Sequence, residues 1–133
     1  MQLVLRAAAL PLALLTLIGS LAFAAPARAD EHTSKPFHGV KANTGTVSHS
    51  RQGAVQTLTL SDDFKVPEAP APHWQIVDSQ GNTYLLQRLV VKGDKFNKQI
   101  ALPGYIRDVA KVQIWCAYAE VLLGEAEFET VQK

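Results

Sequence analysis

The C-terminal part of the chain alternates small or apolar residues with glutamates. The alternating residues are Gly124, Glu125, Ala126, Glu127, Phe128 and Glu129. A period of two residues is typical of a β-strand with one face toward the core and the other toward water. The pattern therefore predicts a strand over residues 121–128 whose carboxylates face solvent.

Similar short runs precede this segment and are separated by turn residues. The expected strands cover residues 45–49, 55–60, 74–77, 83–86, 99–102 and 109–118. Short strands with closely spaced turn signals are typical of antiparallel sheets. We therefore expect an all-β fold, an antiparallel β-sandwich or a small jelly-roll-like barrel of about seven to eight short strands.

Two segments interrupt this strand pattern. Pro67, Pro70 and Pro72 lack the amide hydrogen that a central strand donates, so we expect no central strand through this cluster. Residues 105–110 are the one place where a helical turn could fit.

The N-terminus has the organisation of a secretory signal peptide. Arg6 precedes an apolar run over residues 7–21, and Ala27-Arg28-Ala29 supplies a small-x-small cleavage site. The run has about 15 residues, fewer than the roughly 20 that span a bilayer, and no second run follows. We predict a signal peptide over 1–29, a flexible lead over 30–36 and one domain over 37–130. The mature protein would be periplasmic or extracellular, without a membrane span.

Charge and motifs exclude several functions. The chain has 13 Lys and Arg against 12 Asp and Glu, and no basic stripe, so a nucleic-acid partner is not expected. The sequence contains no Gly-x-Ser-x-Gly motif of hydrolases, no phosphate-binding glycine loop and no His-Glu-x-x-His metal-binding motif. An accessory module is therefore favoured over an enzyme.

Cys116 is the single cysteine, which rules out an intrachain disulfide. In a strand it shares a face with Val112 and Ile114, which points the thiol toward the core. A buried cysteine behaves as a small, unreactive hydrophobic residue. The alternative is a redox thiol that cycles through sulfenic acid or a mixed disulfide with an exported redox protein.

The four histidines lack regular metal-ligand spacing, which disfavours a structural zinc site. A copper site built from Cys116 and two histidines is compatible with a sandwich, although nothing in the sequence brings these residues together. His32 has a more specific interpretation. After cleavage at Ala29 it is the third residue, and with the α-amine of Asp30 it could form a square-planar nitrogen set for Cu(II) or Ni(II). The alternative is a histidine that stands third by chance.

Aromatic side chains suggest a ligand site. Trp74 and Trp115, together with His73, could line a pocket for a sugar or haem. In a domain of this size large aromatics more often belong to the core or to a half-exposed sheet face. The sequence requires no cofactor.

Several segments resemble the DM-thirteen domain, also called the electron-transfer DM domain. The similarity is most specific in Val112-Gln113-Ile114-Trp115-Cys116 followed by Leu123-Gly124-Glu125-Ala126-Glu127-Phe128. Weaker matches are Phe37-His38-Gly39, Gly45-Thr46-Val47, residues 58–64, residues 72–77 and Leu102-Pro103. The chain departs from the family where Ala71 replaces a glycine, where His73-Trp74 replaces a smaller pair, and where Leu123 replaces an aromatic.

The resemblance implies a β-sandwich of the kind that accompanies extracellular cytochrome-type redox modules. It also implies an electron-transfer role for the cysteine that Cys116 matches. The first functional expectation is thus an exported module for thiol-based electron transfer or redox sensing at Cys116. The alternatives are a non-enzymatic ligand-binding or protein-interaction domain with a core cysteine, and Cu(II) or Ni(II) binding at Asp30 and His32.

Overall fold

The computed structural model describes residues 32–92 and 95–133, and all its regular structure there is β. The expected signal peptide and Asp30 lie outside these ranges. In the described part of the chain no helix has the length and apolar character needed to cross a membrane.

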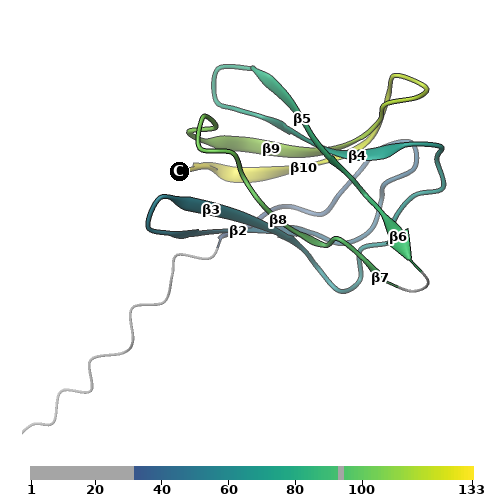
Figure 1. The fold of residues 1–133 in the computed structure, drawn as a ribbon, viewed down its shortest axis with the longest axis horizontal. Coiled ribbons are helices and arrows are strands. Elements are labelled where there is room, and N and C mark those ends of the chain that lie inside the picture. The colour runs from purple at the N-terminus through teal and green to yellow at the C-terminus, as the bar shows by residue number, and fades with distance from the viewer. Residues whose placement is uncertain (1–31, 93–94) are drawn as a thin grey trace, which may run out of the picture.

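The strands form two packed layers (Figure 1). In chain order they are β1 (His32–Thr33), β2 (Val47–Gln52), β3 (Val55–Leu60), β4 (Pro72–Val77), β5 (Thr83–Arg88), β6 (Val91–Lys92), β7 (Lys95–Phe96), β8 (Gln99–Ala101), β9 (Val109–Cys116) and β10 (Val121–Gln132).

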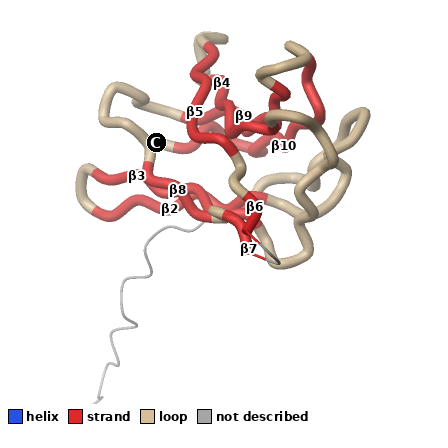
Figure 2. The backbone as a smooth tube through the Cα atoms, turned by 45° about the vertical axis from the view of Figure 1, so that its right-hand side comes forward, coloured by secondary structure: helices blue, strands red, loops and turns tan. Residues whose placement is uncertain are grey.

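Each layer is a four-stranded antiparallel sheet. The first sheet has the order β1-β2-β3-β8 and the second has the order β10-β9-β4-β5. A two-stranded hairpin, β6-β7, follows where the chain leaves β5 and crosses toward the first sheet (Figure 1). Long loops gather at one end of the molecule (Figure 2). The prediction of an all-β sandwich is confirmed.

The core lies between the two sheets. The first sheet contributes Val47, Leu58 and Leu60, which are at most 1% exposed. The second sheet contributes Trp74 and Ile114, both fully buried. Burial of each side chain of this size stabilises the fold by about 1.5 to 3 kcal/mol relative to exposure. These contacts hold the two layers together without a disulfide.

The alternation in β10 agrees with the sequence. Ala126 and Phe128 are buried in the core, whereas Glu127 and Glu129 are exposed. Glu125 is half-buried, because neighbouring side chains on the outer face of the sheet cover it.

Two local expectations are wrong. Pro72 belongs to β4, a central strand of the second sheet, but it is the first residue of that strand, where a missing donor is tolerated. Its carbonyl accepts a hydrogen bond from the Leu89 amide at 2.8 Å. Residues 105–110 form no helical turn. The Ile106 amide closes a tight turn onto the Pro103 carbonyl at 3.1 Å, and β9 begins at Val109.

Part of the expected N-terminal lead is on the first sheet. His32 and Thr33 pair with His49 and Ser48 of β2. The next residue, Ser34, is buried, and its amide donates to the Val47 carbonyl at 2.8 Å. Residues 32–34 thus extend the sheet by a short edge strand.

Candidate functional site

Cys116 ends β9 with its side chain between the two sheets. It is a free cysteine, it is 1% exposed, and it pairs with Pro72 of β4. The expectation that the thiol faces the core is confirmed. Pro72 lines the pocket described below, and Cys116 does not.

The backbone around Cys116 favours the thiolate. The amide of Ala119 makes the largest contribution to a lowered thiol pKa, and those of Ala71 and Tyr118 act in the same direction. Burial opposes this effect. A lowered pKa assists thiol chemistry, but a nucleophile must also reach its substrate, and the 1% exposure of Cys116 restricts that access.

A pocket of about 710 Å³ opens at the end of the sandwich beside β6 and β7. We call it the end pocket. Two segments far apart in the sequence form it, residues 64–69 with Pro72 and residues 88–91 with Phe96. Its lining consists of Phe64, Lys65, Val66, Pro67, Glu68, Ala69, Pro72, Arg88, Leu89, Val90, Val91 and Phe96.

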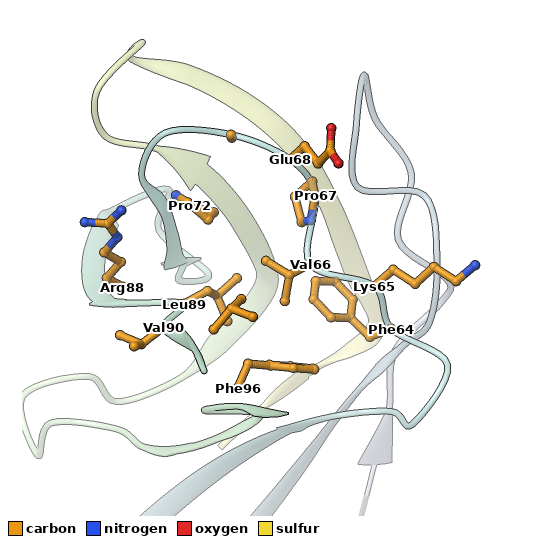
Figure 3. Close-up of a pocket in the computed structure, with 12 residues that line it drawn as sticks. Phe64, Lys65, Val66, Pro67, Glu68, Pro72, Arg88, Leu89, Val90 and Phe96 are labelled. Carbon is orange, nitrogen blue, oxygen red and sulfur yellow. The ribbon is translucent and has the colours of Figure 1, made fainter. Parts of the chain in front are cut away.

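The interior of the end pocket is apolar and its charges lie at the rim. Figure 3 shows the side chains of Val66, Leu89 and Phe96 facing one another, whereas the charged ends of Lys65 and Arg88 point outward. Arg88 is held there because its Nη2 donates to the Pro70 carbonyl at 2.7 Å. The rim carries two cations and one carboxylate, that of Glu68, so its charge is positive.

Side-chain contacts preform the walls. The rings of Phe64 and Phe96 lie 6.0 Å apart across the pocket floor. The amide side chain of Asn97, which directly follows β7, holds the backbone between the end of β5 and the start of β6. Its Oδ1 accepts from the Val90 amide at 2.9 Å, and its Nδ2 donates to the Arg88 carbonyl at 2.9 Å.

The expected aromatic ligand site is divided between two faces of the second sheet. Trp74 is fully buried in the core, and its Nε1 donates to the Asn97 carbonyl at 3.3 Å. His73 and Trp115 are cross-strand neighbours on the outer face. His73 Nδ1 lies 2.8 Å from the Ala71 carbonyl. The structure thus brings His73 and Trp115 together without Trp74, and none of the three lines the end pocket.

The expected N-terminal metal site is only partly described. His32 is exposed on β1, opposite His49, whereas Asp30 lies outside the described residues.

Sequence reasoning missed the end pocket. Its residues come from the proline-containing loop before β4 and from the short strands after β5, which have no periodicity to read. The available signal was the apolar content of the 64–72 segment, because Phe64 and Val66 are of residue types that are usually buried.

No protein-family model matches this chain, and neither a curated protein nor a solved structure shows significant similarity to it.

Proposed function

We propose that the protein is a non-enzymatic binding module whose end pocket takes an apolar molecule with an anionic head group. The observation that carries this proposal is the pocket itself. Its volume of about 710 Å³ falls within the range of roughly 300 to 1,000 Å³ for small-molecule sites. An apolar interior with a few polar groups at the mouth is the usual composition of such sites.

The rim supports the choice of an anionic head group. Lys65 and Arg88 provide two positive charges against the one negative charge of Glu68. Arg88 uses one guanidinium nitrogen to bind Pro70, and a guanidinium has five N–H donors in all. A carboxylate or sulfonate at the mouth would therefore find both charge and donors, while the apolar part of the molecule contacts Val66, Leu89 and Phe96.

In this role Cys116 is a core residue that does not contact the ligand. It belongs to the same hydrophobic cluster as Phe64 and Leu89, which line the pocket. Cys116→Ala would lower the free energy of unfolding by about 1 to 3 kcal/mol. The protein that remains folded would still bind the ligand.

The test is a fluorescence titration with 8-anilinonaphthalene-1-sulfonate, which combines aromatic rings with a sulfonate. We expect saturable binding that Val91→Asp weakens at least about tenfold, because one unpaired carboxylate beside an apolar ligand costs more than 1.4 kcal/mol. Val55→Asp is the matched control. Val55 is 52% exposed and Val91 is 54% exposed, but only Val91 lines the pocket. Equal affinities for the two variants would contradict the proposal.

Head-group preference is tested separately with decanoate and decanol as competitors. Decanoate should displace the dye more effectively than decanol, and Arg88→Gln should remove most of that difference. Equal competition by the acid and the alcohol would leave an apolar pocket without anion selectivity.

A thiol-based electron-transfer or redox-sensing role at Cys116 is the second candidate. The backbone amides that lower the thiol pKa favour it, as does the resemblance to the electron-transfer DM domain. This role predicts that maleimide and dilute peroxide modify Cys116 in the folded protein. Modification that requires urea would instead support the core role. Metal binding at Asp30 and His32 remains a separate proposal, which truncation of these residues would test.

A further inference from the structure

Three metal-binding side chains meet on the outer face of the second sheet, and none of them lines the end pocket. Glu125 and Glu127 lie two residues apart on β10, so both point to this face. His38 comes from the loop beside β10 and forms an isolated bridge with Glu125. One ligand atom from each of the three side chains lies within 4.8 Å of the other two.

The backbone holds His38 at this position. Its amide donates to the Glu125 carbonyl at 3.0 Å, and the Glu125 amide donates back at 2.9 Å. Gly39, the next residue, lies so close to β10 that an added Cβ would stand 2.4 Å from the Gly124 Cα. The segment is therefore docked on the strand, and the imidazole is not carried by a free loop.

A chain of amides positions the Glu125 carboxylate. Gln75 Nε2 donates to Gln113 Oε1 at 2.7 Å, and Gln113 Nε2 donates to Glu125 Oε2 at 2.9 Å. Gln75 and Gln113 are 7% and 9% exposed although they belong to the outer face. A carboxylate has two oxygens, so Oε2 can keep this hydrogen bond while Oε1 binds an ion. Partners of this kind orient metal ligands in proteins.

The charge around the three side chains also favours a cation. Lys111 Nζ lies 3.3 Å from Glu125 Oε2, and one ammonium against two carboxylates leaves a negative charge. The Lys111 side chain is 31% exposed and can turn toward solvent when a metal ion arrives.

We propose that His38, Glu125 and Glu127 form a binding site for a divalent transition metal ion, Zn²⁺ in the first place, with Gln113 as a positioning residue. One imidazole nitrogen and two carboxylate oxygens are ligands that Zn²⁺ takes at about 2.0 to 2.2 Å. Mg²⁺ and Ca²⁺ prefer oxygen alone, so the imidazole selects against them. Three protein ligands leave a fourth position for water or for a ligand from a partner.

Isothermal titration of the intact protein with Zn²⁺ tests this site. We expect His38→Gln and Glu127→Gln each to weaken Zn²⁺ binding at least about tenfold. Loss of a residue that only hydrogen-bonds to a metal ligand already weakens metal binding by about 10- to 100-fold, and loss of a ligand should cost no less. Mg²⁺ should give no comparable heat. The control is His73→Gln, which changes a half-buried histidine of β4 that belongs to neither candidate metal site and should leave Zn²⁺ affinity unchanged.

Two further variants separate this site from a purely structural ion pair. Lys111→Met should tighten Zn²⁺ binding because it removes the competing ammonium, whereas a structural role for the pair predicts only a small loss of stability. Gln113→Ala leaves all three metal ligands in place but should weaken Zn²⁺ binding by roughly 10- to 100-fold. Circular dichroism must show that this variant is folded. Absence of Zn²⁺ binding in the native protein, equal affinity in His38→Gln, or a loss in His73→Gln instead would overturn the proposal.

Discussion

His49 is an imidazole inside the core of a small sandwich. It is 2% exposed, its Nε2 lies 2.9 Å from Gln56 Oε1, and Gln56 in turn donates to the Ile106 carbonyl at 2.7 Å. Phe128 packs edge-on against the ring at 6.4 Å. The hydrogen bond satisfies a neutral imidazole, but a charged imidazole at this position would lose hydration without gaining an anionic partner.

Stability should fall as the pH is lowered because of this residue. Burial is the main cause that lowers the pKa of His49 below 6.5, and the nearby charges of His32 and Arg51 add to it, while the Gln56 bond opposes it. The unfolded chain then binds the proton more readily than the folded one. The stabilisation is complete above pH 6.5 and is lost as the pH drops through the lower folded value.

Urea unfolding at pH 7.5 and pH 5.5 measures this effect. The midpoint should be lower at pH 5.5, and His49→Gln should reduce the difference between the two midpoints, whatever its effect on absolute stability. His32→Gln, at an exposed histidine, should retain most of the difference. A midpoint difference that is the same in wild type and His49→Gln would assign the pH dependence to other groups.

Strand β10 and the loop beside it show how one element positions another. The Leu123 carbonyl accepts hydrogen bonds from the Lys41 and Ala42 amides, both at 2.9 Å. This approach requires Gly124, because an added Cβ would stand 2.3 Å from the Ala42 carbonyl oxygen. The contact is between backbones, so no side-chain rotation can relieve it.

Gly124→Ala should therefore destabilise the protein by about 1 to 3 kcal/mol, the usual cost of forcing atoms into a packed region. Gly104→Ala is the control, since nothing lies within 4 Å of a Cβ at Gly104. Its free energy of unfolding should stay within about 0.5 kcal/mol of wild type. Denaturant unfolding of the two variants gives the comparison, and equal stabilities would mean that the loop moves away without cost.

At the level of elements, the sequence predicted those strands that bury one face. In β10 the alternation of Ala126 and Phe128 with exposed glutamates identifies the strand directly. β6 and β7 have two residues each, which is too short for any period to appear. Pro72 misled the prediction because strand position, and not residue type alone, decides whether a proline is tolerated.

Neither candidate site was predictable, because each depends on how distant segments come together. The end pocket needs the 64–72 loop placed against β6 and β7. The His38 cluster needs the register that sets His38 opposite Glu125. The spacing of histidines along the chain cannot reveal this cluster, because His38 and the two glutamates lie on segments that are distant in the sequence.

On the scale of the whole molecule, two sheets and one hydrophobic core provide the stability. The described core residues include Cys116, whose side chain is buried. An intermolecular disulfide would require this thiol to leave the core. The folded protein should thus exist without covalent dimers.

The melting temperature should therefore be the same with and without dithiothreitol, and a non-reducing gel should show a single monomer band. Differential scanning fluorimetry at two protein concentrations provides the measurement. A lower melting temperature in reductant, together with a dimer band that disappears in Cys116→Ser, would mean that the cysteine joins two chains.

The segment docked on β10 also bears on how copies of this protein meet. An outer strand with free amide and carbonyl groups is a template for pairing with strands of other chains, which leads to aggregation. β10 is an outer strand of the second sheet, but Lys35 and His38 already bind the carbonyls of Glu127 and Glu125 along that edge. Strand addition at β10 is blocked for as long as the segment stays in place. On the opposite side of the same sheet, Thr83–Arg88 of β5 is the edge where self-association would begin.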